Sequence, residues 1–221
     1  MYAARIFAMI TAIPIHESAH AWVSSMLGDP TAKNLGRISL NPMKHFDVMG
    51  TMCLLLLGFG WAKPVPVDSR YYTNRKAGMA MSSIAGPLAN FLLAFFFMII
   101  SKILYYLYAF TSPSAVIDTM RLLCDYSVLI NIVLMVFNML PVPPLDGSRI
   151  FLIFLPERMY FEVMKAERYI MFILFALIWT GVLNRPLAAM QSSVLVFLDT
   201  ATRFIDVVMR LILAPSATAI L

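Results

Sequence analysis

The hydrophobic positions of this chain form long unbroken stretches separated by short polar connections. A helix needs about 20 mainly apolar residues to cross a bilayer. Four stretches approach or exceed that length, at about Ile6–Leu27, Met79–Phe110, Leu122–Leu140 and Tyr169–Leu183. The first ends at Gly28-Asp29-Pro30, and the third ends at the proline-rich Pro141-Val142-Pro143-Pro144. Proline lacks an N–H and restricts the residue before it, so both breaks predict helix ends.

Two further apolar stretches do not follow this pattern. Val48–Gly60 is too short to cross as a helix and is flanked by glycines. A re-entrant β element, buried against protein at membrane depth, is the more economical prediction. Leu187–Leu213 carries charged residues at helical spacing on one stripe: Asp199, Arg203, Asp206 and Arg210. It predicts either an interfacial helix with i,i+4 ion pairs or a span whose polar stripe packs inward, and the sequence leaves both open.

Composition supports the same fold class. Hydrophobic residues make up 61% of the 221 and charged residues 13%, with a mean hydropathy of +0.80, far from the values of soluble domains. We therefore expect an all-α polytopic membrane protein with about four to five transmembrane helices. We expect one membrane-embedded domain over residues 1–221, with a catalytic core at about 1–150 and C-terminal helices at about 151–221.

The net charge of +5 indicates how the chain is oriented in the membrane rather than nucleic-acid binding, because the basic residues lie between apolar spans. They concentrate in the connections after the first and third spans, which the positive-inside rule places in the cytoplasm, with the N-terminus outside. Cys53 and Cys124 lie in or beside apolar stretches without metal-like spacing, so we interpret both as core residues. The first apolar stretch shows no cleavage pattern of a removed signal peptide.

The first span carries the chemistry. In His16-Glu17-Ser18-Ala19-His20 the two histidines are four positions apart, so on a helix both can reach one tetrahedral zinc ion. Glu17 lies beside that site and could take a proton from a water activated by the metal. Polar side chains satisfied by neighbouring helices are the alternative, but ionisable groups inside an apolar span are expensive and indicate function.

A catalytic zinc ion takes a third protein ligand. The candidates are His45, Asp29, Asp47, Asp68 and Asp146. The first four belong to a polar connection, and for His45 and Asp47 capping or packing roles are the ordinary expectation. Asp146 directly follows the third span, at the same predicted membrane depth as the histidines, and a proline break could turn it back towards them.

The chain resembles the site-2 proteases, the intramembrane zinc metalloproteases of peptidase family M50. The resemblance rests on three motifs, His16 to His20, Gly86-Pro87-Leu88-Ala89-Asn90 and Asn138 to Gly147, with further likeness at Gly28 to Lys33, Leu40-Asn41-Pro42 and Gly60 to Val67. It covers about Pro14 to Arg149 and is closest to a compact prokaryotic-type branch. Many members add a PDZ or a nucleotide-sensing CBS domain; this chain has no stretch polar enough for either.

The resemblance implies a function for six residues. It implies one zinc ion per chain, held by His16, His20 and Asp146, with Glu17 as the catalytic acid and base. Asn138 matches a position thought to hold the substrate backbone in extended form, and Asn90 is a weaker substrate-binding candidate. Gly86 and Pro87 could instead serve helix packing and a local kink.

The predicted partners are transmembrane proteins or peptides as substrates, and the lipid bilayer. The predicted location is a prokaryotic cell membrane, with the active site nearer the cytoplasmic side. Two other functions would use the same residues: a metal ion transporter or channel, since intramembrane His, Glu and Asp also line ion pathways, and a catalytically silent membrane scaffold. Cobalt or manganese could also occupy a site of two histidines and a carboxylate.

Overall fold

The computed structural model describes residues 2–50, 52, 62–110 and 114–217, and over these residues it contains helices and short turns without a β-strand. The α-helices are α1 (Tyr2–Met26), α2 (Thr31–Asn34), α4 (Arg75–Phe110), α5 (Ala115–Asn138), α6 (Asp146–Phe151), α7 (Glu157–Lys165), α8 (Glu167–Trp179), α9 (Asn184–Ala201) and α10 (Arg203–Ala217). Three 3-10 turns are η1 (Pro42–Lys44), η2 (Ser69–Tyr71) and η3 (Leu152–Phe154).

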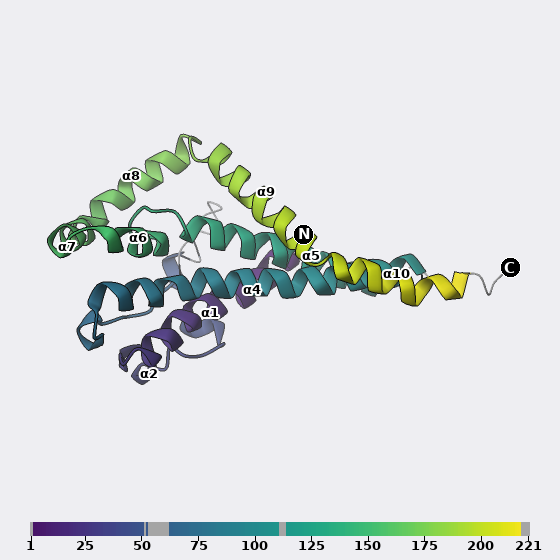
Figure 1. Ribbon diagram of the computed structural model, residues 1–221, viewed down its shortest axis with the longest axis horizontal. Helices are drawn as coiled ribbons and strands as arrows, with labels where there is room; N and C mark the ends of the chain where they lie inside the picture. Colours follow the sequence, from purple (N-terminus) through teal and green to yellow (C-terminus); the bar gives the residue numbers. More distant parts are fainter. Residues whose placement is uncertain (1, 51, 53–61, 111–113, 218–221) are drawn as a thin grey trace.

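The core is built from α1, α4 and α5, which pack against one another; α4 and α5 run along the long axis of the molecule, and α1 lies obliquely to them (Figure 1). Apolar side chains of α4 and α5 meet in one buried cluster, joined by one residue of α9: Ala94, Phe97, Cys124, Val128, Ile132, Val136 and Leu198. The interpretation of Cys124 as a core residue is confirmed, since it is buried and not disulfide-bonded. Cys53 lies outside the described residues.

Two of the described helices, α4 and α5, are long and apolar enough to cross a membrane. The prediction of spans at Met79–Phe110 and Leu122–Leu140 is therefore confirmed, with starts four and seven residues earlier than expected. Helices α8 and α9–α10 together meet the same criteria, but the pair is bent by 85°. The described residues thus contain two to three candidate spans by length and composition, and the predicted number of four to five is not confirmed.

Helix α1 forms over the first predicted stretch, Ile6–Leu27, but is not among the helices apolar enough to count as a candidate span. Four of its polar residues, His16, Ser18, His20 and Ser24, are buried, so they lower its hydropathy without facing the exterior. The residues proposed to bind metal thus lower the mean hydropathy by which α1 would be identified as a membrane span.

The C-terminal third forms an arch (Figure 1). Helix α8 has only 13 residues, so the predicted span at Tyr169–Leu183 is too short alone. Gly181, at a φ of +74°, turns the chain between α8 and α9. The stretch Leu187–Leu213 is two helices that break at Thr202, rather than one.

Asp199, Asp206 and Arg210 of that stretch contact α4, although Asp199, Arg203 and Arg210 remain exposed. Lys102 of α4 pairs with Asp199 at 2.9 Å and with Asp206 at 2.8 Å. Arg210 donates to the Tyr106 hydroxyl at 3.4 Å. The i,i+4 pairs expected within Leu187–Leu213 are therefore replaced, among the described residues, by contacts to α4.

Most of the predicted re-entrant element, Val48–Gly60, lies outside the described residues. Its first three residues are helical, and Asp47 accepts a hydrogen bond from the Gly50 N–H at 2.8 Å, as a helix cap does. Phe46 and Ala62 form an isolated antiparallel bridge. The chain therefore leaves and returns at neighbouring points.

Candidate metal centre

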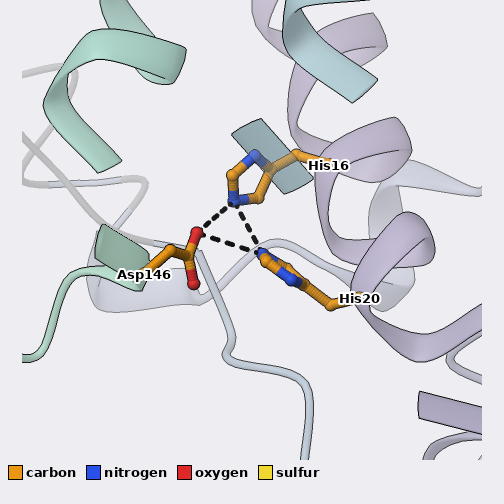
Figure 2. A group of neighbouring side chains, drawn as sticks. All are labelled: His16, His20 and Asp146. Carbon is orange, nitrogen blue, oxygen red and sulfur yellow. Dashed lines mark hydrogen bonds and ion pairs between the residues drawn. The ribbon is translucent and has the colours of Figure 1, made fainter. Parts of the chain in front are cut away.

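Three side chains from distant parts of the sequence meet at the inner face of α1 (Figure 2). The Nε2 atoms of His16 and His20 are 3.0 Å apart. Oδ2 of Asp146, at the start of α6, lies 3.3 Å from the first and 3.2 Å from the second. Among the described residues this is the group of His, Cys, Asp and Glu side chains whose atoms converge closely enough to hold a metal ion.

The geometry and chemistry of this trio fit zinc. A tetrahedral site with zinc–ligand distances of about 2.0–2.1 Å has ligand–ligand separations of about 3.3 Å, close to the three distances observed. Oδ2 of Asp146 is buried and has no hydrogen-bond donor among the described residues, and a buried carboxylate oxygen without a partner is costly. Burial opposes ionisation of Asp146, whereas protonated His20 and His16 lower the pKa of its carboxyl below the usual range.

Helix α1 places the two histidines one turn apart on its buried side, with exposures of 7% and 8%. Nδ1 of His20 lies 2.7 Å from the Ser82 carbonyl. A carbonyl oxygen only accepts, so this nitrogen carries the hydrogen and Nε2 keeps its lone pair for a metal. Nδ1 of His16 lies 2.5 Å from Oδ1 of Asn90.

Helix α4 meets the histidines through three positions at i, i+4 and i+8, which are Ser82, Gly86 and Asn90. Gly86 lies between the other two, where a Cβ atom would come within 2.3 Å of His20 Nε2 and 2.6 Å of His16 Cε1. Glycine is therefore required for the two imidazoles to rest against the α4 backbone. This explains the Gly86 to Asn90 motif better than general helix packing does.

The turn between α5 and α6 directs Asp146 back to α1. The Leu145 N–H donates to the Val142 carbonyl at 3.0 Å, and the Pro143–Pro144 peptide bond is cis. Gly147 closes the turn, since a Cβ there would lie 2.3 Å from the Met139 carbonyl oxygen. The proline-rich break thus acts as the sequence predicted.

Glu17 lines a cavity of about 590 Å³ beside the three side chains. The cavity walls come from α1, the extended segment 62–67, α4, the turn before α6, and α8. They comprise His16, Glu17, His20, Ala62, Pro64, Val65, Val67, Ser82, Ser83, Asn138, Pro144, Asp146, Arg149, Glu167, Met171 and Phe175. A carboxylate, a candidate metal trio and a space large enough for several residues of peptide therefore adjoin one another.

Comparison with known proteins agrees with this geometry. A sequence model of peptidase family M50 matches residues 107–181. The chain is 39% identical over 166 residues to "Putative zinc metalloprotease YwhC" of Bacillus subtilis (strain 168), an alignment that covers 74% of each protein. The chain belongs to peptidase family M50. This M50 protein is also 27% identical over 139 residues to "Putative zinc metalloprotease Rip2" of Mycolicibacterium smegmatis, covering 60% of this chain and 50% of that protein.

No solved structure matches the M50 protein significantly. The region matched by the family model includes Asp146 but not His16 or His20. The fold nevertheless brings His16 and His20 of α1 next to Asp146, which lies in the matched region.

Three of the other candidates for a third ligand are occupied elsewhere in the M50 protein. Asp29 accepts from the Ser24 hydroxyl and from the N–H groups of Thr31 and Asp68 at 2.8–3.0 Å. Asp68 pairs with Arg70 at 2.6 Å, and that guanidinium lowers the pKa of the Asp68 carboxyl to about 2. Asp29 and Asp68 thus have structural roles, and the cap formed by Asp47 confirms the role expected of it.

His45 is the fourth candidate that the structure directs elsewhere. It is fully buried, and Nε2 donates to the Ser39 carbonyl at 2.6 Å. Burial lowers the pKa of its imidazole. Its ring therefore supports the loop after α1 through Ser39.

The two asparagines expected to bind substrate lie in different environments. Asn138 is the last residue of α5 and lines the cavity, with Nδ2 donating to the Leu134 carbonyl at 3.0 Å. Asn90 is fully buried and is not part of the cavity wall. It contacts His16 and Asn131 instead, so the structure places it behind a metal-binding candidate rather than in front of a substrate.

Sequence reasoning missed Ser82 and Asn131. The i, i+4, i+8 spacing of Ser82, Gly86 and Asn90 was visible in the sequence. Nothing in the sequence, however, indicated that this face of α4 meets α1.

Proposed function

We propose that this M50 protein is an intramembrane zinc metalloprotease that hydrolyses peptide bonds within or near the transmembrane segments of membrane proteins. The observation that carries the proposal is the convergence of His16, His20 and Asp146 beside Glu17. Two imidazoles and one carboxylate leave the fourth position of a tetrahedral zinc site open, which is the arrangement of catalytic rather than structural zinc.

When bound, zinc supplies a Lewis acid for the scissile carbonyl and lowers the pKa of water to about 7. The residues of the chain do the rest. His16, His20 and Asp146 hold the metal, and Glu17 takes the proton of the attacking water and delivers it to the nitrogen of the leaving amine. The cavity beside α8 holds the peptide near these groups.

A substrate must reach the cavity in extended form, because carbonyls inside a helix are hydrogen-bonded and shielded. Asn138 lies on the cavity wall and can hold a peptide backbone with its amide. Residues of the segment 62–67 also line the cavity, and the edge of this segment can pair with a peptide strand. A re-entrant element over Val48–Gly60 belongs to the same proposal.

We place the protein as a multi-pass protein of a prokaryotic cell membrane, with about four to five crossings and the site nearer the cytoplasmic side. Helices α4 and α5 support membrane insertion. The concentration of lysine and arginine after α1 and after α5 supports the orientation. Cysteine labelling of a variant without native cysteines tests it: a cysteine at Ser39 is expected to react only after the cytoplasmic side is opened.

The decisive experiment compares Glu17→Gln with the unchanged protein in liposomes, after measuring zinc content. We expect one zinc ion per chain in both, cleavage of a transmembrane reporter by the unchanged protein, and a loss of at least about a hundredfold in Glu17→Gln. Glu157→Gln, on the outer helix α7, is the matched control and retains full activity.

Three results would contradict the proposal. Cleavage by zinc-loaded Glu17→Gln at the unchanged rate would refute the role of Glu17. Zinc flux across the liposomes without cleavage would indicate a transporter. Neither flux nor cleavage by the zinc-loaded protein, tested on reporters with different transmembrane sequences, would indicate a silent scaffold.

A further inference from the structure

Three buried side chains form a hydrogen-bonded chain that runs away from the metal-binding candidates across α4 and into α5. Nδ1 of His16 contacts Oδ1 of Asn90, Nδ2 of Asn90 donates to Oδ1 of Asn131 at 2.8 Å, and Nδ2 of Asn131 donates to the Ser127 carbonyl at 2.8 Å. Asn90 and Asn131 both have 0% exposure. Bulk solvent therefore does not reach either amide.

The Ser127 carbonyl, at the end of this series of hydrogen bonds, determines the direction of every hydrogen bond in the series. The Ser127 carbonyl can only accept, so Asn131 must present its NH₂ group to it and its amide oxygen to Asn90. Asn90 must then present its NH₂ group to Asn131 and its oxygen to His16. An oxygen at that position can only accept, so Nδ1 of His16 must carry a hydrogen and Nε2 must be free to bind metal.

We propose that Asn90 and Asn131 are positioning residues that fix the tautomer and ring orientation of His16 for zinc. The inference rests on the proposed function, because it assumes that the trio binds zinc. His20 needs no such relay, since the Ser82 carbonyl contacts its Nδ1 directly. A backbone carbonyl thus fixes the hydrogen on Nδ1 of both histidines. For His20 the carbonyl acts directly, and for His16 it acts through two amide side chains.

The relay has an energetic reason. The interior between α1, α4 and α5 is otherwise lined by small and apolar residues, and an unpaired amide buried there costs about 1–3 kcal/mol. Either asparagine can turn its amide over only by setting donor against donor and acceptor against acceptor. The amide orientations are therefore locked. Partners of this kind behind a metal-binding histidine change metal affinity by about 10- to 100-fold when removed.

Zinc affinity of the detergent-purified protein, measured by competition with a chelator, tests the inference without a cleavage assay. Asn90→Leu is expected to bind zinc about 10- to 100-fold more weakly, because nothing then holds the His16 Nδ1 hydrogen. Asn90→Asp is expected to stay close to the unchanged affinity, because a carboxylate also accepts that hydrogen. Asn131→Leu is expected to lose about tenfold, because it frees the Asn90 amide to turn.

The order of the two Asn90 variants separates positioning from packing. If Asn90 only filled space between helices, the apolar leucine would be tolerated better than a buried carboxylate. Positioning predicts the reverse order for zinc affinity. The visible spectrum of the cobalt-substituted protein reports the ligand geometry directly and should differ from the unchanged spectrum in Asn131→Leu and Asn90→Leu, but not in Asn90→Asp.

Ser101→Ala is the matched control. It removes another hydrogen bond between α4 and α5, from Ser101 to Asp125, well away from the metal centre. Its zinc affinity should be unchanged. Equal weakening in Ser101→Ala, or unchanged affinity in both leucine variants, would overturn the relay while leaving the protease proposal intact. Absence of zinc binding in the unchanged protein would overturn both.

Discussion

A methyl group on Gly86 would lie 2.3 Å from Nε2 of His20 and 2.6 Å from Cε1 of His16. The two imidazole rings cannot both stay in place, because the added methyl group would clash with both of them. We expect Gly86→Ala to lower zinc content to well under one ion per chain and to abolish cleavage. Overpacking of this kind also costs about 1–3 kcal/mol of stability.

The control for Gly86→Ala is Ala89→Ser, which adds one atom to the same turn of α4 on a partly exposed side. Zinc content by metal analysis should remain at one ion per chain in Ala89→Ser. A Gly86→Ala protein with full zinc content and full activity would show that the α1–α4 contact is looser than described.

Asp29 allows a prediction about pH. Burial opposes its ionisation, but hydrogen bonds from Thr31, Asp68 and Ser24 outweigh burial and lower the pKa of its carboxyl from the usual 3.8. A lowered pKa in the folded state means that the ionised carboxylate stabilises the fold fully above pH 3.8, and that this contribution is lost as the pH falls through the folded pKa.

We expect Asp29→Asn to lose about 2 kcal/mol at pH 7, because the amide has one acceptor oxygen where the carboxylate has two. Thermal unfolding in detergent measures this loss. The difference in melting temperature between the two proteins should narrow below pH 4. A difference that stays constant from pH 7 to pH 3 would argue against an ionised Asp29 in the folded protein.

Helix α8 forms one wall of the cavity through Glu167, Met171 and Phe175, spaced one turn apart. Met171→Trp places a larger side chain in the path of the peptide. We expect cleavage to fall by about ten- to a hundredfold, since small misplacements of a substrate cost that much, while zinc content stays at one ion per chain.

Phe172→Trp is the comparison for Met171→Trp, because Phe172 is the next residue of α8, is 64% exposed and does not line the cavity. Cleavage by Phe172→Trp should match that of the unchanged protein. Equal losses in both variants would mean that α8 affects activity through the arch as a whole rather than through the cavity wall.

The elements that the sequence predicted correctly are those with a continuous apolar signal. Helices α4 and α5 each follow one such stretch, and the motif on α1 has helical spacing that needs no tertiary information. The turn to Asp146 was predictable because proline blocks a helix from continuing.

The elements that sequence reasoning misjudged depend on packing between distant segments. Asp199 and Asp206 fit i,i+4 pairs on their own stretch, yet Lys102 of α4 is the partner that the fold brings closer. Asn90 was a substrate-binding candidate in the sequence, but the packing of α1 against α4 brings its amide oxygen to Nδ1 of His16. Hydrophobic periodicity and composition do not show which residues distant in the sequence come into contact.

At the scale of the whole molecule, the pairs from Lys102 to Asp199 and Asp206 join the C-terminal helices to α4. Removing one partner of a fully buried pair costs about 3–5 kcal/mol. The side chain of Asp199 is 55% exposed, so solvent screens part of this attraction. We expect Lys102→Met to lose about 1–2 kcal/mol and to loosen α9 and α10, seen as faster proteolysis near Thr202.

Arg158→Met provides the contrast for Lys102→Met, since it removes an exposed pair with Glu162 on α7. Its melting temperature should change little, because exposed pairs contribute about 0–1 kcal/mol. If the two variants were equally stable, the C-terminal helices would be held by apolar contacts rather than by the charges.

The distance along the chain between His20 and Asp146 also bears on biosynthesis. Proteins are made from the N-terminus at about 5–20 residues per second, so α1 waits several seconds or longer before the turn that bears Asp146 has been made. Until α5 is in place and has reversed the chain, the two histidines have no carboxylate to complete their site. On the proposed ligand assignment, proteolytic competence arises only after α5 and the turn to Asp146 have been made, so a half-inserted molecule cannot cut its neighbours.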